Sequence, residues 1–377
     1  MGAEHPEGQY LEPRAKRPGY RSYRRSEFPR DGKYQTAMSS VPADNQTVAS
    51  QAAAGWRSLP PEYAIPQRAP SLQEAQQYCA RLAHSHYENF SVVTWFLPKR
   101  LHQHFYNVYA YCRISDDLGD EVGNSEQALA LLDVWEAELN ATYLSLVEPP
   151  AADVQQDVEK LTAADSGRNP IGPRHPVFIA LRETIRECDI PRQPFADLLT
   201  AFRQDQKVTR YPAFDDVLGY CHYSANPVGH LVLYLCGYHD AERQKLSDYT
   251  STALQLANFW QDVAVDYGKG RIYLPLKDLA KYGVSESDIA ERRATPQFLA
   301  MMQFDVERAR EWFRMGLPLA KVVDKHLALD IELFSRGGME ILNAIEGQGY
   351  DVLSRRPAIS KPRKLWLVAR AAAGKLL

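Results

Sequence analysis

The sequence of 377 residues lacks the features of several common protein classes. Its five cysteines include no C-x-x-C pair, and an odd, unpaired count favours free thiols over a disulfide framework. The formal net charge of −3 excludes a globally basic nucleic-acid binder. There is neither an apolar run of the roughly 18–20 residues that span a bilayer nor a Sec-type signal peptide. These absences predict an intracellular protein, cytoplasmic or peripheral on the inner face of the cell membrane.

Several cofactor and metal motifs are missing as well. The chain has no H-E-x-x-H, and no glutamate is followed by histidine three residues later, which argues against zinc protease and ferritin-like di-iron sites. It has no G-x-G-x-x-G, and the lone Gly268-Lys-Gly270 is not a phosphate-binding P-loop. A metal or phosphate site in this chain must therefore be built in another way.

No stretch shows the apolar/polar alternation of a half-buried β-strand, whereas apolar residues recur at helical spacing from residue 71 onward. Ser71 followed by Glu74 is a capping-box pattern that opens a helix ending near residue 84. Further helices are expected at 98–118, 126–147, 175–188, 192–204, 214–238, 243–266, 297–316 and 321–346. The predicted fold class is therefore all-α, a single large helical bundle.

Composition divides the chain into three segments. Residues 1–68 are rich in Pro, Gly, Ser, Gln and Arg without a hydrophobic period, which predicts a disordered, basic extension. Residues 69–350 form the expected helical domain, with a long connection at 149–175. Residues 351–377 combine basic residues with leucines and a tryptophan, a pattern typical of a helix at a membrane interface. Packing of this segment on the bundle is the alternative.

Two acidic motifs carry the functional prediction. The first, RISDDLGD, spans residues 113–120, and the second, NFWQDVAVD, spans residues 258–266. Each contains two aspartates four residues apart, which puts both carboxylates on one face of a helix. Aligned like charges within apolar and aromatic sequence are unfavourable unless a cation lies between them. The alternative, a solvated helix face, is weakened by the presence of two such motifs.

Mg²⁺ fits this oxygen-only set, because it binds through carboxylates and takes further ligands from water and substrate phosphate. Two such helices facing each other would hold Mg²⁺ and a diphosphate. The candidate metal ligands are Asp116, Asp120, Asn258, Asp262 and Asp266. The basic residues near the motifs, which can contact phosphate oxygens, are Arg113, Lys269 and Arg271.

At these motifs the sequence resembles the squalene/phytoene synthase family of head-to-head prenyltransferases, over about residues 76–350. The motifs match the family's R-x-x-D-x-x-x-D and N-x-x-x-D-x-x-x-D patterns, and residues 220–229 (YCHYSANPVG) resemble its Y-C-x-Y-x-A-G-x-V-G segment. The resemblance implies an isoprenoid-synthase bundle with an apolar tunnel, Mg²⁺ as cofactor, and farnesyl or presqualene diphosphate as substrate. It also implies a catalytic Tyr220 near the reacting carbons and a substrate-binding Tyr109.

Two departures from the family pattern indicate a subgroup. Residues 86–90 read HYENF where the family has a Ser-rich H-S-x-S-F segment, and Asn226-Pro227 stands where glycine is usual. Both features resemble the hydroxysqualene synthases of bacterial hopanoid pathways. That resemblance implies ionisation of presqualene diphosphate, rearrangement of the carbocation, and its capture by water rather than hydride.

The residues of the HYENF segment have candidate roles in this chemistry. Glu88 is the candidate catalytic residue that orients or deprotonates the water, with a role in capping a helix as the alternative. His86 and Asn89 are candidate substrate-binding residues. The aromatic residues that could stabilise a carbocation, or simply form core, are Tyr109, Tyr220, Phe259 and Trp260.

Functional alternatives of two kinds remain open at this point. Within the family, the reaction could instead yield squalene or dehydrosqualene, presqualene diphosphate, or phytoene. Outside it, the same bundle could serve a non-catalytic protein that binds prenyl lipids. Because the product would be very apolar, peripheral membrane contact and neighbouring pathway enzymes are the expected partners.

Overall fold

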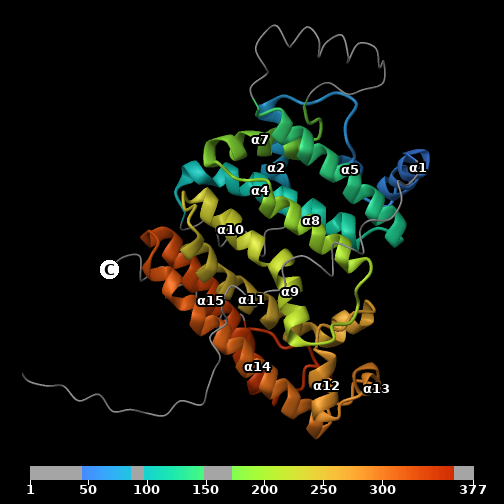
Figure 1. The fold of residues 1–377 in the computed structure, drawn as a ribbon, viewed down its shortest axis with the longest axis vertical. Helices are drawn as coiled ribbons and strands as arrows, with labels where there is room; N and C mark the ends of the chain where they lie inside the picture. The colour runs from blue at the N-terminus through green and yellow to red at the C-terminus, as the bar shows by residue number, and fades with distance from the viewer. Residues whose placement is uncertain (1–44, 86–96, 148–171, 361–377) are drawn as a thin grey trace, which may run out of the picture. The chain divides into compact units, whose positions relative to one another are not determined.

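The computed structural model describes residues 45–85, 97–147 and 172–360, and their regular secondary structure is helical (Figure 1). The described residues from 46 onward belong to one compact unit, to which the following description applies. Within the described residues, β-type pairing is confined to an isolated bridge between Arg210 and Ile272. The predicted all-α fold class is confirmed.

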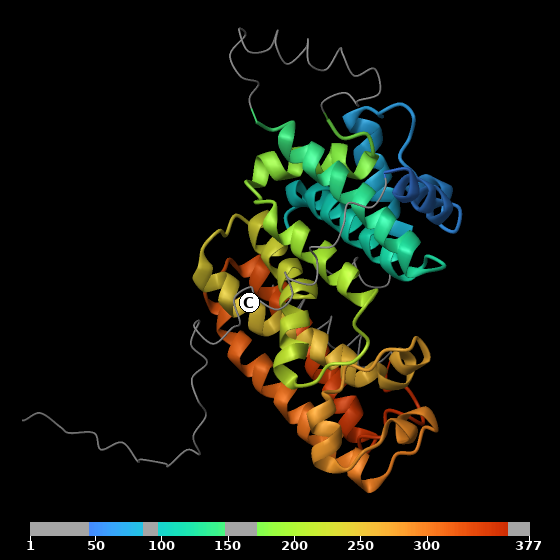
Figure 2. The same ribbon diagram turned by 45° about the vertical axis from the view of Figure 1, so that its right-hand side comes forward.

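A first set of helices shares one hydrophobic core (Figures 1 and 2). These elements are α1 (Asn45–Trp56), η1 (Pro61–Tyr63), α2 (Leu72–Ser85), α4 (Lys99–Asp120), α5 (Ser125–Leu144), α7 (Pro176–Cys188) and α8 (Gln193–Asp205). At its centre, the rings of Tyr111, Trp135, Phe178 and Phe195 are fully buried. Tyr111 meets Phe178 and Phe195 edge to face and donates a hydrogen bond to the carbonyl of Phe195 at 2.8 Å. This packing fixes α4, which carries the first acidic motif, against α8.

A second set of helices packs around α11, which carries the second acidic motif. Its elements are α9 (Phe214–Ser224), α10 (Asn226–Leu235), α11 (Ala241–Gly268), α12 (Leu276–Tyr282), α13 (Glu286–Ala290), α14 (Pro296–Gly316), η2 (Leu317–Lys321) and α15 (Lys325–Gly347). Helices α11 and α14 pack closely at Gly316. A Cβ added to this glycine would lie only 2.9 Å from the backbone nitrogen of Thr250, so the contact leaves no room for a side chain. α10 contacts α4 and α8, so the two sets form one bundle.

Local signals explain several helix boundaries. The predicted capping box is present: the Glu74 carboxylate accepts from the Ser71 backbone N–H at 2.8 Å, and Ser71 Oγ accepts from the Glu74 N–H at 3.3 Å. The expected helix at 214–238 is instead two helices, α9 and α10, that meet at Ala225. Pro227 stands in the first turn of α10, where its missing N–H costs no helical hydrogen bond.

The structure differs from the sequence prediction at residues 45–68, which we expected to belong to a disordered extension. Helix α1 and the turn η1 lie in this range, and Ala52, Leu59 and Tyr63 are buried in the first hydrophobic core. A Cβ on Gly55 would lie 2.8 Å from the Leu131 side chain, so α1 packs closely on α5. Because small and polar residues dominate this segment, its few buried apolar residues do not produce a helical period in the sequence.

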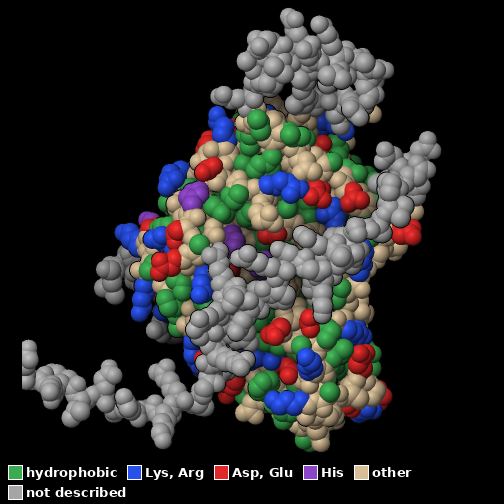
Figure 3. Space-filling model, viewed as in Figure 1, with side chains coloured by type: hydrophobic (Ala, Val, Ile, Leu, Met, Phe, Trp, Pro, Cys, Tyr) green, Lys and Arg blue, Asp and Glu red, His purple; other side chains and the backbone are tan. Residues whose placement is uncertain are grey.

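The surface agrees with the nearly balanced composition. Figure 3 shows Lys and Arg side chains interspersed with Asp and Glu over the described part of the face that it presents. None of the described helices is both long and apolar enough to cross a bilayer. Most of the expected connection at 149–175, and the C-terminal segment from residue 361, lie outside the described residues.

Candidate active site

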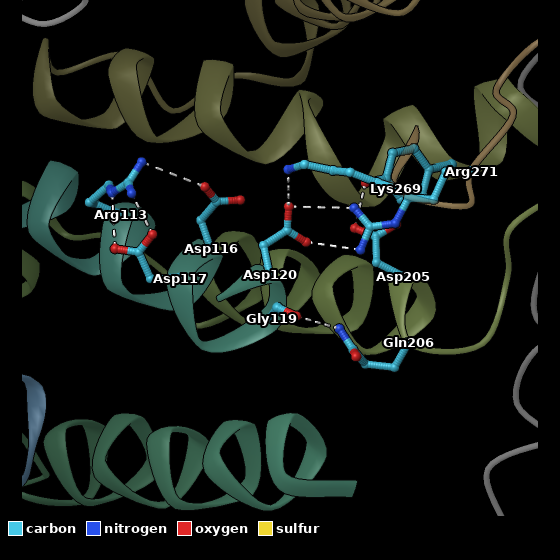
Figure 4. Close-up of polar contacts among 10 residues, drawn as sticks. Arg113, Asp116, Asp117, Gly119, Asp120, Asp205, Gln206, Lys269 and Arg271 are labelled. Carbon is cyan, nitrogen blue, oxygen red and sulfur yellow. Dashed lines mark hydrogen bonds and ion pairs between the residues drawn. The ribbon is translucent and has the colours of Figure 1, made fainter. Parts of the chain in front are cut away.

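The first acidic motif occupies the last turns of α4 (Figure 4). Arg113 makes two hydrogen bonds to Asp117: Nε donates to Oδ2 at 3.0 Å, and Nη2 donates to Oδ1 at 2.5 Å. Its Nη1 lies 4.0 Å from the Asp116 carboxylate. Arg113 was predicted to contact substrate phosphate, and in the structure its main partner is the second aspartate of its own motif. Asp120 points in the direction of the turn that follows α11.

That turn brings two cations to Asp120. Gly270 has a φ of +82°, which glycine adopts without strain, and the Arg271 N–H bonds to the Asp266 carbonyl at 2.9 Å. Arg271 donates to the Asp120 carboxylate at 2.9 and 3.5 Å, and Lys269 Nζ lies 3.4 Å from it. Residues that follow the second motif therefore pair with the last aspartate of the first, so the turn after α11 lies close to the end of α4.

A further carboxylate, Asp205 at the end of α8, lies beside this ion pair (Figure 4). The Tyr220 hydroxyl donates to its Oδ2 at 2.8 Å, and its buried Oδ1 has no hydrogen-bond partner among the described residues. Tyr220 also belongs to a group of rings with Tyr211, Phe259 and Tyr273. Phe259 and Tyr273 stack with their centroids 3.9 Å apart. An aromatic cluster thus adjoins the charged groups.

Like charges and burial shape the electrostatics of the motifs. Burial, reinforced by the charge of Asp120, raises the pKa of Asp116 to about 6. Burial, reinforced by the charge of Asp262, raises the pKa of Asp266 to about 7. The side-chain carboxylate of Asp266 has no hydrogen-bond or ion-pair partner within the described ranges. When they are ionised, these two carboxylates therefore carry negative charge that the chain compensates only in part.

Arg271 influences the pKa values of two neighbouring carboxylates, Asp120 and Asp205. Burial alone would raise the pKa of Asp120, but hydrogen bonds and charge from Arg271, with help from Lys269, lower it below its usual value. At Asp205 burial dominates and raises the pKa to about 7, although Arg271 opposes this rise. The same guanidinium thus keeps Asp120 ionised while Asp205 can hold a proton near neutral pH.

The second motif is paired with the C-terminal segment. Arg356 contacts both carboxylate oxygens of Asp262, with Nη2 to Oδ2 at 2.9 Å, and also donates to Gln261 at 3.1 Å. Asn258 donates to Asp262 at 3.2 Å. Val352 and Leu353 are each 1% exposed and belong to the second hydrophobic core, so the start of this segment packs on the bundle. The expected membrane helix, from residue 361 onward, lies outside the described residues.

The described side chains alone do not form a closed metal site. Among them, no three His, Cys, Asp or Glu residues gather closely enough to hold an ion. Instead, cations of the chain pair with the predicted ligands, as Arg271 and Lys269 do with Asp120 and as Arg356 does with Asp262. The candidate metal-ligating atoms are all oxygens of aspartate and asparagine side chains. Such a set suits a hard divalent cation that also takes ligands from a bound phosphate.

Several predicted site residues fall elsewhere. His86, Glu88 and Asn89 lie outside the described residues. Trp260 is fully buried in the second core, and Tyr109 is partly buried one turn before Arg113. Burial raises the pKa of Tyr109, against the nearby positive charge of Arg113.

Sequence reasoning missed Asp205, Tyr273 and Arg356. Asp205 lies in a polar stretch, RQDQK, with no motif of its own, and only the fold brings it to Tyr220. Arg356 was counted among the basic residues of a membrane segment, whereas it is 94 residues away from its partner Asp262. The sequence around Arg356 carries no signal that sets it apart, since adjacent arginines also occur at Arg24-Arg25 and Arg292-Arg293.

Asp205 makes folding stability depend on pH. Its folded-state pKa of about 7 lies above the unfolded value of roughly 3.9, so the folded protein binds the proton more tightly. The free energy of unfolding should therefore fall as the pH rises from 4 to 7. Asp205→Asn is expected to be more stable than the wild type at pH 8, with a smaller difference at pH 5, in urea unfolding. Asp215→Asn, an exposed residue of α9, controls for the loss of one charge, and an equal gain in both variants would contradict the assignment.

Comparisons with known proteins agree with the motifs. Residues 83–363 match the sequence model of the squalene/phytoene synthase family. The fold is similar to squalene synthase HpnC from Alicyclobacillus acidocaldarius, with a TM-score of 0.64 and 40% identity over 78% of this chain and 98% of that chain. The chain is 28% identical over 315 residues to 15-cis-phytoene synthase of Synechococcus elongatus, covering 80% of this chain and 94% of that protein.

A plant relative is longer than this chain. Phytoene synthase 3 of Zea mays is 27% identical over 306 residues, which cover 80% of this chain and 66% of that protein. The resemblance predicted from the motifs is confirmed by these matches together with the all-α fold.

Proposed function

This chain belongs to the squalene/phytoene synthase family of head-to-head prenyltransferases, and within it we propose that the chain converts presqualene diphosphate to hydroxysqualene. The observation that supports a squalene-type over a phytoene-type reaction is the higher identity to squalene synthase HpnC than to the phytoene synthases. The HYENF and YSANPVG segments support water as the terminal reactant. In the structure, Asn226 of the second segment is buried and accepts a hydrogen bond from Thr252 at 2.9 Å.

The first step breaks the bond between the cyclopropylcarbinyl carbon and the diphosphate oxygen, and the electron pair leaves with the diphosphate. We assign to Arg271 and Lys269, which pair with Asp120, the compensation of the charge that develops on this leaving group. The proposed ligands of Mg²⁺ are Asp116, Asp120, Asn258, Asp262 and Asp266. When bound, Mg²⁺ supplies Lewis-acid stabilisation of the departing diphosphate.

The partly uncompensated carboxylates support this assignment. Asp116 and Asp266 have raised pKa values because burial and like charges surround them, and a divalent cation would relieve that repulsion. Arg356 and Arg271 already bind neighbouring members of the set, so the site favours cations in general. With substrate phosphate as an additional ligand donor, the residues present fit Mg²⁺.

The carbocation must then rearrange without losing a proton to solvent. The rings of Tyr220, Phe259 and Tyr273 lie next to the charged groups and offer π faces that stabilise positive charge. Water finally attacks the rearranged cation through its oxygen and gives up a proton. We assign the acceptance of this proton to Glu88, with His86 and Asn89 binding the substrate beside it.

Product analysis tests the proposal. The enzyme, presqualene diphosphate and Mg²⁺ are incubated in H₂¹⁸O with and without NADPH, and products are identified by mass spectrometry. The expected product is a C30 alcohol that carries one ¹⁸O atom and does not require NADPH. A hydrocarbon formed only with NADPH would instead identify a squalene synthase.

Farnesyl diphosphate provides the second comparison. The similarity to phytoene synthases favours condensation of two prenyl diphosphates as the alternative reaction. Release of presqualene diphosphate from farnesyl diphosphate alone, with no turnover of added presqualene diphosphate, would support that alternative and overturn the proposed reaction.

Glu88 can be tested in the same assay. Glu88→Gln is expected to lower alcohol formation at least tenfold while diphosphate release stays within about twofold, because proton transfer to a positioned base contributes on the order of 10²–10⁴ to a rate. Glu242→Gln, in the first turn of α11, serves as the control. Unchanged alcohol formation in Glu88→Gln would remove Glu88 from the proposal.

A further inference from the structure

A segment outside the matched family region reaches the first acidic motif. The family match begins at residue 83, whereas Tyr63 belongs to the short turn η1 at Pro61–Tyr63. Tyr63 is 3% exposed and lies in the same hydrophobic core as α4. Its hydroxyl donates a hydrogen bond to Asp117 Oδ2 at 2.9 Å, across 54 positions of sequence.

Asp117 is the carboxylate that also holds Arg113. Its side chain is 7% exposed, and it receives Nε of Arg113 on Oδ2 at 3.0 Å and Nη2 on Oδ1 at 2.5 Å. Tyr63 is therefore a third donor to one buried carboxylate. A buried carboxylate needs such partners, because each lost hydrogen bond leaves desolvated charge uncompensated.

The hydrogen bond from Tyr63 to Asp117 also affects the orientation of Arg113, because Asp117 binds that side chain. An arginine side chain has many rotamers, and two of its three nitrogens are fixed by Asp117. The third, Nη1, is left on the side of Asp116, at 4.0 Å from that carboxylate. The orientation of Asp117 thus decides where the remaining donors of Arg113 point.

We propose that Tyr63 is a positioning residue that orients Arg113 through Asp117 for contact with the substrate diphosphate. The inference rests on the proposed function, in which Arg113 contacts that group. It makes residues 45–68 a functional part of this enzyme, because their burial against α5 and the first core holds Tyr63 in place.

A matched control, Tyr78 of helix α2, contacts the same turn. The Tyr78 hydroxyl donates to the backbone carbonyl of Glu62 at 2.9 Å, so it also fastens η1, but it does so without contacting Asp117. Tyr63→Phe and Tyr78→Phe each remove one hydroxyl that anchors the same turn. A purely structural role for Tyr63 predicts that the two variants behave alike.

The test measures binding of inorganic diphosphate, with Mg²⁺ present, to the full-length chain by calorimetry. Tyr63→Phe is expected to weaken binding about tenfold, as for loss of one hydrogen bond to a charged group, whereas Tyr78→Phe stays within about twofold. Thermal unfolding of both variants reports any general loss of stability. Asp117→Asn, which preserves shape, should weaken binding to a similar extent and should not add to Tyr63→Phe.

Variants of Arg113 distinguish a failure of the positioning role from a failure of the proposed function on which it rests. Arg113→Ala should itself weaken diphosphate binding, and Tyr63→Phe should then have no further effect in that background. Equal effects of Tyr63→Phe with and without Arg113, or equality with Tyr78→Phe, would overturn the positioning role alone. Binding unaffected by Arg113→Ala would overturn both the positioning role and the proposed diphosphate site.

Discussion

Replacing Asp120 with asparagine is expected to lower the rate of diphosphate release from presqualene diphosphate by about 10²- to 10³-fold. Asp120 is the residue at which the two acidic motifs meet, because it lies on α4 and receives Arg271 and Lys269 from the turn after α11. Asparagine keeps the shape of the side chain but removes the charge. The two cations then lose their anchor, and one proposed ligand of Mg²⁺ is lost.

The measurement is the release of inorganic diphosphate under saturating substrate, together with the Mg²⁺ concentration that gives half-maximal rate. Asp120→Asn should require more Mg²⁺ as well as turn over more slowly. Asp133→Asn is the control, since Asp133 pairs with Arg203 on the exposed side of α5 and lies outside the proposed site. A change of less than threefold in Asp120→Asn would contradict the role given to the first motif.

Arg271→Ala is expected to reduce kcat/KM for diphosphate release by about 10²-fold, and Arg271→Lys by about tenfold. The guanidinium makes two contacts to Asp120 and opposes the protonation of Asp205, and lysine can reproduce the charge but not the fork of donors. Loss of this charge should raise the pKa values of both carboxylates. The acidic limb of the pH–rate profile should therefore move to higher pH in Arg271→Ala.

Arg293→Ala provides the control for loss of an arginine. Arg293 pairs with Asp288 and Glu291 around the short helix α13, and its side chain is 47% exposed. Its removal should leave both kcat/KM and the pH profile within about twofold of the wild type. An unshifted acidic limb in Arg271→Ala would contradict the electrostatic coupling between Arg271 and its two carboxylates.

Helices that carry the motifs were predictable because their signals are local. The Asp-x-x-x-Asp spacing, the apolar residues around it and the Ser71–Glu74 capping box all act within a few residues, and the structure confirms helices α2, α4 and α11 near the expected bounds. The short helices α12 and α13 were not predicted. They depend on a left-handed Gly283 and on the Ser285–Asp288 capping box rather than on a hydrophobic period.

The missing parts of the site depend on contacts between distant residues. Tyr63 reaches Asp117 across 54 positions, and Arg356 reaches Asp262 across 94. Neither residue belongs to a recognisable motif, so sequence reasoning placed Tyr63 in a disordered extension and Arg356 in a membrane segment. Asp205 was missed for the same reason, since burial beside Tyr220 rather than spacing gives it its raised pKa.

The central claim is that carboxylates of α4 and α11 bind divalent cations and a diphosphate at one shared site. The most direct measurement is a crystal structure of the full-length chain with Mn²⁺ and inorganic diphosphate, with anomalous scattering used to locate the metal. The account predicts Mn²⁺ peaks within about 2.5 Å of carboxylate oxygens from both motifs, bridged by the diphosphate. Metal bound to one motif alone, or diphosphate bound away from Asp120 and Asp266, would contradict it.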